Sequence, residues 1–323
     1  MKPSPVLLVD AASLYYRAFH GVPDRRRDPA APPNNAVRGL LDMTASLLTA
    51  RGASGLAMCW DEDWRPAFRV EALPSYKEHR LAEGEEKAED TPPDLVPQVP
   101  VICELLAALG IARIGSPGHE ADDVLGTLAS SLAGQVPVEV VTGDRDLFQL
   151  VDDELDVRVV YTARGGVRDA DAVDCSWLQQ RYGVASGERY ADLAVLRGDA
   201  SDGLPGVRGI GEKTAAALLE EFGSLAGIQQ AVTSGDPRIK GARRARLEEG
   251  AGYLAAAPRV VHVVRDAPLR LLGGAGPIGP VADPLGAVAL PVEVADPDTL
   301  EALRQSHDLG GSVDRVLAAL GLA

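Results

Sequence analysis

Short apolar runs alternate with longer amphipathic stretches along the first half of the chain. Four runs are typical of buried strands, at residues 5–10, 55–61, 110–115 and 136–142. Three stretches carry apolar residues at helical spacing and predict helices, at about 35–49, 94–109 and 121–133. Because parallel strands need crossover helices, this alternation predicts an α/β fold with a mostly parallel central sheet flanked by helices.

Acidic residues follow the predicted strands. The first strand ends at Asp10 and the second at Asp61, while Asp144 and Asp146 follow the strand over 136–142. A single Asp at such a position is usually a turn or cap residue. In a parallel sheet, however, all these strand ends meet at the edge where ligands bind. Acids delivered there by three strands indicate a site for divalent cations, which prefer oxygen ligands.

The segment EADD crowds three carboxylates, Glu120, Asp122 and Asp123, in front of an apolar run. One interpretation is a helix N-terminus, where acids complement the helix dipole. The other is cation binding, and the acids expected at the same edge of the sheet favour it. Bound cations would offset the repulsion among the three carboxylates.

The composition limits the class of protein. With 323 residues, 46% of them hydrophobic, the chain can bury a sizeable core in one or two domains. A net charge of −15 argues against a nucleic-acid coat protein but not against a nuclease, whose metal site concentrates acids. Three cysteines without a CxxC pair argue against a zinc site or a disulfide framework. Without a signal peptide or an 18-residue apolar stretch, we expect a cytoplasmic protein with no membrane contact.

A glycine-rich loop between two helical stretches lies in the second half. Residues 206–214 (GVRGIGEKT) nearly match a P-loop, but a glutamate separates the last glycine from Lys213 and Thr214, and no strand precedes the loop. This argues against ATP or GTP binding. A helix–hairpin–helix fits better, since Gly209 and Gly211 would expose backbone N–H groups to a nucleic-acid phosphate. The alternative is a plain packing corner between helices.

Six motifs together resemble the bacterial 5′-nuclease (flap endonuclease-like) family, which includes the N-terminal 5′-3′ exonuclease domain of DNA polymerase I. They occur in family order from residue 6 to about 222, as LLVDAASLYYRAFH, CWDEDWRPAFR, LPSYKEHR, GHEADDVLGTLA, VVTGDRDLFQLV and RGDASDGLPGVRGIGEKTA. The resemblance implies a PIN-like α/β core, a helical arch and a C-terminal helix–three-turn–helix DNA-binding subdomain. No polymerase sequence follows, so we expect a stand-alone member.

We expect two domains on this basis. The catalytic core would span residues 1–175, with the arch at about 62–94. A helical DNA-binding region would span 176–323, including a Gly- and Pro-rich segment at about 268–298 to which we assign no chemistry.

The resemblance also implies the reaction and its cofactors. Family members hydrolyse DNA phosphodiester bonds at 5′ ends and flaps with two divalent ions, here expected to be Mg²⁺ with Mn²⁺ as a substitute. Two such ions about 4 Å apart can activate a water and stabilise the leaving oxygen. The implied metal ligands are Asp10, Asp61, Glu120, Asp122, Asp123, Asp144, Asp146, Asp199 and Asp202. A monovalent cation at the helix–hairpin–helix turn is a further expectation.

The SYKEHR motif holds the implied residues at the base of the arch. Lys77 and Arg80 are three apart, so a helix would place both on one face as catalytic contacts to the scissile phosphate. Tyr76 is expected to stack on a base. Arg17 and Arg69 are further expected DNA contacts, together with Gly209, Gly211, Lys213 and Thr214 of the hairpin. The alternative for SYKEHR is a solvated basic helix.

Several further features bear on where DNA would run along the protein. Residues 81–90 (LAEGEEKAED) are strongly acidic where a single strand should pass. Gly203 stands where the family often has Asn, a neutral change because both tolerate positive φ. The basic runs at 25–27 and 238–246 are typical of solvated faces, though both could track a DNA duplex.

Two other classes of function stay open at this point. One is a structure-specific DNA-binding module without catalysis, and the other is an RNA-directed nuclease. The expected partners are 5′-ended or branched DNA, RNA primer–DNA hybrids and a separate DNA polymerase. The expected purpose is primer or flap removal in replication and repair, and we expect the protein to be a monomer.

Overall fold

The computed structural model describes residues 3–24, 26, 31–85 and 88–323. Within these ranges one eight-stranded sheet has the order β6-β5-β4-β1-β2-β3-β7-β8. Strands β1 to β5 pair with one another in parallel, whereas β6, β7 and β8 pair antiparallel with their neighbours. The mostly parallel sheet predicted from the sequence is confirmed. The strands are β1 (Val6–Asp10), β2 (Gly55–Cys59), β3 (Ala112–Gly115), β4 (Val138–Thr142), β5 (Val157–Tyr161), β6 (Asp171–Val173), β7 (Arg270–Gly273) and β8 (Gly276–Pro280).

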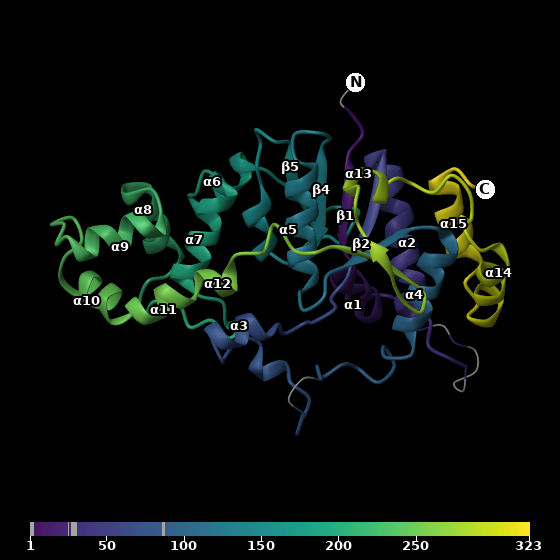
Figure 1. Cartoon of the computed structure of the whole chain (residues 1–323), viewed down its shortest axis with the longest axis horizontal. Coiled ribbons are helices and arrows are strands. Elements are labelled where there is room, and N and C mark those ends of the chain that lie inside the picture. Colours follow the sequence, from purple (N-terminus) through teal and green to yellow (C-terminus); the bar gives the residue numbers. More distant parts are fainter. Residues whose placement is uncertain (1–2, 25, 27–30, 86–87) are drawn as a thin grey trace.

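Helices cover both faces of the sheet (Figure 1). Successive side chains of a strand point to opposite faces, so Leu8 of β1 joins one apolar cluster while Leu7 and Val9 join the other. Helices beside Leu8 include α5 (Ala121–Leu132), η2 (Asp146–Leu150), α6 (Cys175–Tyr182) and α7 (Gly187–Arg197). Helices on the opposite face are α1 (Ala11–Gly21), α2 (Asn35–Arg51), α4 (Gln98–Leu109), α14 (Pro297–Ser306) and α15 (Gly310–Leu320).

The segment expected to form the arch contains two short helices, α3 (Ala67–Ala72) and η1 (Glu78–Arg80). Lys77 precedes η1 with a positive φ of 48°, which an α-helix does not allow. Residues 75–80 (SYKEHR) therefore form a turn and one short 3₁₀ helix rather than the α-helix that would place Lys77 and Arg80 on one face. Residues 86–87, within the acidic run, lie outside the described residues, as do residues 25 and 27 of the basic run at 25–27.

Small helices form one end of the molecule (Figure 1, left). They are η3 (Ala200–Asp202), α8 (Glu212–Phe222), α9 (Leu225–Thr233), α10 (Gly241–Glu249), α11 (Ala251–Ala256) and α12 (Pro258–Val261). Helices α7 and α8 flank the glycine-rich loop. Gly209 has a φ of 72° in that loop, and Gly211 is the N-cap of α8. This arrangement agrees with the predicted helix–hairpin–helix.

The C-terminal segment returns to the sheet. Strands β7 and β8 extend it beyond β3, α13 (Pro284–Ala287) follows, α14 packs on α4, and α15 packs on α2. Leu300, Leu309 and Val313 are buried in that contact. The expected division placed all of 176–323 in a helical DNA-binding region. The segment from about residue 270 instead belongs with the α/β core, because its strands join the sheet and its apolar side chains complete the core.

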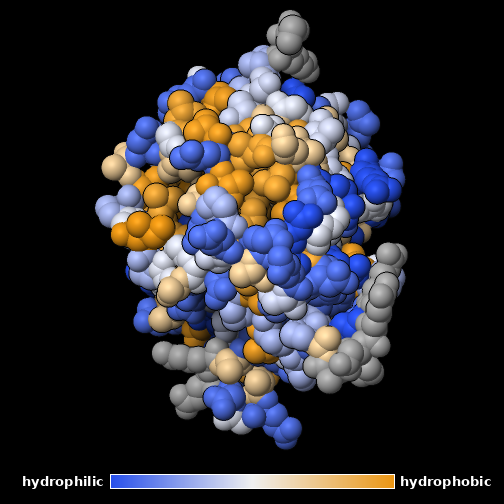
Figure 2. Space-filling model, turned by 90° about the vertical axis from the view of Figure 1, so that its right-hand side faces the viewer, coloured by the Kyte–Doolittle hydropathy of each residue, from blue (hydrophilic) through white to orange (hydrophobic). Residues whose placement is uncertain are grey.

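The end of the molecule that carries α14 and α15 also presents apolar residues to the surface, as Figure 2 shows. Ile278, Leu285 and Val292, all from the C-terminal segment, are exposed apolar side chains. Among the described helices, none combines the length and the apolar character needed to span a membrane.

Candidate active site

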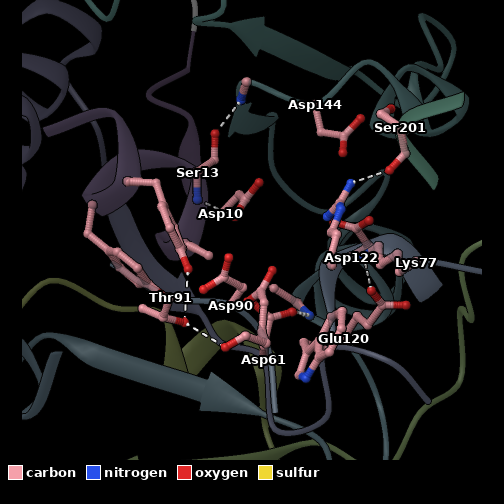
Figure 3. Close-up of a pocket in the computed structure, with 18 of the residues that line it drawn as sticks. Asp10, Ser13, Asp61, Lys77, Asp90, Thr91, Glu120, Asp122, Asp144 and Ser201 are labelled. Carbon is pink, nitrogen blue, oxygen red and sulfur yellow. Dashed lines mark hydrogen bonds and ion pairs between the residues drawn. The ribbon is translucent and has the colours of Figure 1, made fainter. Parts of the chain in front are cut away.

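A pocket of about 950 Å³ lies where the parallel strands end. Its wall contains seven of the residues singled out from the sequence, which come from five separate stretches of chain (Figure 3). Five are acidic and two are basic: Asp10, Asp61, Glu120, Asp122, Asp144, Lys77 and Arg80. The tertiary structure therefore brings together five of the acids that were predicted to meet at one edge of the sheet.

Asp10 shows how the sequence positions such an acid. It is the last residue of β1 and the N-cap of α1, where its Oδ1 accepts a hydrogen bond from Ser13 N at 3.0 Å. Its Oδ2 accepts one from the Thr142 hydroxyl at 2.8 Å. Burial raises the pKa of Asp10 to about 7, and repulsion from Asp61 and Asp144 adds to the shift.

Two further acids meet at the start of α5. Asp61 accepts a hydrogen bond from the backbone of Ala121 at 2.8 Å, which ties the loop after β2 to this helix. Asp122 lies in the first turn of α5 and faces the pocket. Burial raises the pKa of Asp122 well above its ordinary value, with added repulsion from Asp144 and Asp10. Burial also raises the pKa of Asp61.

Three predicted ligands lie beside the residues that line the pocket. Burial raises the pKa of Asp202 to about 6 and that of Asp146 well above its usual value. Oδ1 of Asp146 is buried and has no hydrogen-bond partner among the described residues. Asp199 is 5% exposed; burial opposes its charge, but hydrogen bonds from Ser201 and Arg145 lower its pKa.

Basic side chains of the chain already bind several of these acids. Lys77 pairs with Glu120, Arg80 with Asp202 at 2.8 Å, and Arg145 with Asp199. In the described ranges, no three His, Cys, Asp or Glu side chains are arranged to hold a metal ion as they stand. The chemistry of the donor set nevertheless fits hard divalent cations, because it offers buried carboxylates and, on Asp146, an unpartnered oxygen.

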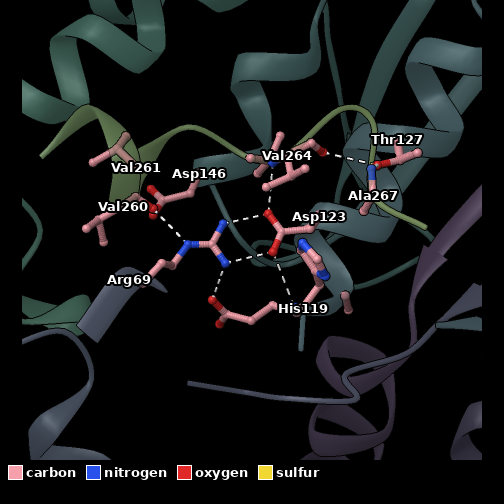
Figure 4. A network of polar contacts seen from close by, with 12 residues as sticks. Arg69, His119, Asp123, Thr127, Asp146, Val260, Val261, Val264 and Ala267 are labelled. Atoms are coloured by element: carbon pink, nitrogen blue, oxygen red, sulfur yellow. Dashed lines mark hydrogen bonds and ion pairs between the residues drawn. The ribbon is translucent and has the colours of Figure 1, made fainter. Parts of the chain in front are cut away.

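The structure overturns three residue predictions. Asp123 was expected among the metal ligands, but its side chain is fully buried outside the pocket, and both of its oxygens accept hydrogen bonds from Arg69 at 2.6 and 2.8 Å. Arg69 was expected to contact DNA and is only 2% exposed. Tyr76 was expected to stack on a base, yet it is 3% exposed and its hydroxyl donates to Glu120 at 2.7 Å. Figure 4 shows the network around Arg69.

The other predicted DNA contacts lie elsewhere. Lys213 and Thr214 are in the first turn of α8, the former exposed and the latter half-buried. A Cβ at Gly211 would meet no atom within 4 Å, whereas one at Gly209 would collide with the Arg246 side chain. Arg17 on α1 is half-buried, and none of these residues is among those that line the described pocket.

Sequence reasoning missed some residues of the pocket wall, among them Ser13, Arg145 and Ser201. The Ser13 hydroxyl accepts a hydrogen bond from Gly143 N at 2.8 Å, joining α1 to the loop after β4. Arg145 had a usable signal, since it stands between the two aspartates of GDRD. The two serines had none, because a single serine has many ordinary roles in a folded chain.

An acid-lined pocket at the end of a parallel sheet, in a chain that also carries a helix–hairpin–helix, has the donor chemistry of a metal-dependent nuclease. The chain belongs to the 5′-3′ exonuclease family. That family's N-terminal resolvase-like domain matches residues 5–183, and its C-terminal SAM fold matches residues 185–273. The family resemblance inferred from the six motifs is therefore confirmed.

Individual relatives agree with this assignment. The chain is 52% identical to a 5′-3′ exonuclease of Streptomyces coelicolor and 44% identical to one of Mycobacterium tuberculosis, over 97% and 98% of its length and 99% and 98% of theirs. It is 36% identical over 83% of its length to a DNA polymerase I of Mycobacterium bovis, of which the match spans 28%. A solved structure of a phage T5 flap endonuclease, a pseudo-enzyme-product complex with DNA and metal ions, has the same fold. Its TM-score is 0.60 at 16% identity, and the match covers 98% of both chains.

Proposed function

We propose that the protein is a structure-specific 5′-3′ exonuclease and flap endonuclease that hydrolyses DNA with divalent cations. One observation carries the proposal. Five carboxylates from four separate stretches of chain line one 950 Å³ pocket that also contains Lys77 and Arg80. The named 5′-3′ exonuclease relatives and the T5 complex with DNA and metal ions support the same reading.

In this proposal the acids divide into two groups. The pocket acids Asp10, Asp61, Glu120, Asp122 and Asp144 would hold divalent cations, two Mg²⁺ ions that Mn²⁺ can replace. Asp146, Asp199 and Asp202 adjoin them and would act directly or through water. The bound ions supply an activated water and a counter-charge for the leaving oxygen.

The basic residues of the pocket would bind the substrate. Lys77 and Arg80 now neutralise Glu120 and Asp202. With divalent cations bound to the acids, Lys77 and Arg80 would be available to bind the scissile phosphate and its developing charge. Arg145 also lines the pocket and pairs with an acid, Asp199, so it is a third basic group that could bind the substrate.

The helix–hairpin–helix would hold the duplex part of the substrate. Gly211 caps α8 and leaves open space beside its backbone, so a phosphate can approach the N–H groups at this helix N-terminus. We assign the monovalent cation to the Gly209 turn. Binding to branched or 5′-ended DNA, a separate DNA polymerase partner, a monomeric state and a cytoplasmic setting belong to the same proposal.

Cleavage of end-labelled substrates tests the function. We expect Mg²⁺-dependent release of the flap strand from a 5′-flap duplex, abolished by chelation. Asp122→Asn should leave less than about a tenth of that activity, because it removes a central pocket charge. Asp42→Asn, at an exposed ion pair on α2, is the matched control and should cleave normally. Tight flap binding by the wild type without cleavage would indicate a non-catalytic DNA-binding module, and faster cleavage of a matched RNA flap would indicate an RNA nuclease.

A further inference from the structure

Glu120 is held more tightly than the other acids of the pocket. Its Oε2 accepts hydrogen bonds from the Tyr76 hydroxyl at 2.7 Å and from Arg69 Nη1 at 2.6 Å. Its Oε1 pairs with Lys77, which lines the pocket. Tyr76 and Arg69 are almost completely buried, so water does not compete for Oε2. The two oxygens of this carboxylate thus have different surroundings, one enclosed by protein and the other towards the pocket.

Arg69 is itself fixed on every side (Figure 4). Its Nε donates to Val260 O at 3.0 Å, and its two Nη atoms donate to Asp123. Asp123 in turn accepts a hydrogen bond from Val264 N at 2.9 Å. The guanidinium therefore joins α3, the first turn of α5 and the chain around α12. Its planar fork has no room to rotate, and neither has the carboxylate oxygen that it holds.

Tyr76 adds a second fixed donor to the same oxygen. Its ring lies in the apolar cluster beside α5, and its backbone N–H donates to Leu73 O at 3.0 Å. Two rigid donors on Oε2 leave the Glu120 carboxylate one orientation, with Oε1 directed at Lys77. Lys77, which lines the pocket, is the partner of that second oxygen.

We propose that Arg69 and Tyr76 are positioning residues that hold Oε2 of Glu120 and thereby present Oε1 to a divalent cation. This inference rests on the proposed function, in which Glu120 is a metal ligand. It assigns both residues a part in the reaction that needs no contact with DNA. Hydrogen bonds to the ligands of a metal typically change its affinity 10–100-fold when they are removed.

Binding of Mn²⁺ to the DNA-free protein, followed by electron paramagnetic resonance, tests the inference. Tyr76→Phe keeps the ring and removes only the hydroxyl, so it should raise the Kd for Mn²⁺ about tenfold. Arg69→Lys should have an effect of similar size, since a lysine lacks the planar five-donor fork that here reaches Glu120, Asp123 and Val260 O together. Tyr253→Phe is the matched control: it removes a hydroxyl that donates to the backbone of Val195 at 3.0 Å, and its Kd should stay within about twofold of wild type.

Glu120→Gln separates the two levels of the argument. If it raises the Kd for Mn²⁺ more than tenfold while Tyr76→Phe binds within about twofold of wild type, the positioning role is refuted and the proposed function stands. If Glu120→Gln itself leaves the Kd unchanged, the ligand assignment in the proposed function fails. A lower melting temperature for Tyr76→Phe with unchanged Mn²⁺ affinity would show a purely structural role. Should Arg69→Lys fail to fold, Tyr76→Phe decides alone.

Discussion

The metal-free pocket should make the protein less stable as the pH rises. Burial raises the pKa of Asp10 from 3.8 to about 7, so the native state keeps a proton that the unfolded chain loses near pH 4. Between these values the native protein binds more protons than the unfolded one. Stability is therefore greatest below pH 4 as far as this group is concerned, and it falls as the pH rises towards 7.

The structure sets the size of the effect. The shift of about three pKa units corresponds to a loss of roughly 4 kcal/mol for Asp10. With about 2.1 cal/mol/K of unfolding entropy per residue, that is roughly 6 °C in melting temperature for a chain of this length. Asp202, with its pKa near 6, shifts stability in the same direction. Divalent cations replace the protons, so the stabilisation by Mg²⁺ should grow with pH.

Thermal melts at pH 5.5 and 8 with a chelator measure this, with Asp10→Asn as the comparison. Asparagine carries no charge to bury, so the variant should melt above the wild type at both pH values, by a margin about twice as large at pH 8 as at pH 5.5. Taking the difference between the two proteins removes groups of opposite sign, such as His262, whose pKa burial lowers. A wild type that melts no lower than Asp10→Asn at pH 8, or equal stabilisation by Mg²⁺ at both pH values, would refute the reasoning.

Three other changes test separate parts of the structure. Lys77→Ala should lower the single-turnover cleavage rate by ~10²-fold while weakening DNA binding in Ca²⁺ only modestly. A rate within about threefold of wild type would show that Lys77 only neutralises Glu120 and does not act in catalysis. Gly211→Val should weaken duplex binding in gel shifts without changing the melting temperature, because its φ of −90° suits valine and its Cβ meets nothing in the protein. A normal affinity would contradict the proposed binding of duplex DNA at the helix–hairpin–helix. Leu309→Ala should cost ~2–5 kcal/mol in urea unfolding, since this side chain is fully buried, and a cost below about 1 kcal/mol would mean that the C-terminal segment is not part of the core.

Much of this architecture is local in origin and could be predicted from the sequence. The apolar runs place four parallel strands, and an acid follows each run that ends at the pocket edge. Asp10 and Gly211 act at helix starts, as their residue types suggest. Such features depend on backbone preferences and on the spacing of apolar residues over a few positions, which a sequence shows directly.

Only the tertiary structure decided which acids face the pocket. Asp122 and Asp123 are neighbours in α5, but 3.6 residues per turn place them about 100° apart. The packing of α5 against β1 directs one into the pocket and turns the other towards Arg69. Arg69 and Tyr76 look like DNA contacts in sequence because their charge and ring imply exposure, while their burial follows from partners more than 40 residues away.

The C-terminal segment makes the same point for the fold. We assigned no chemistry to its glycines and prolines, yet residues 270–280 add two strands to the sheet, and α15 covers α2. Local composition determines that such a segment forms short elements. Where those elements go depends on the apolar faces that the rest of the chain leaves uncovered, and only the assembled structure shows those faces.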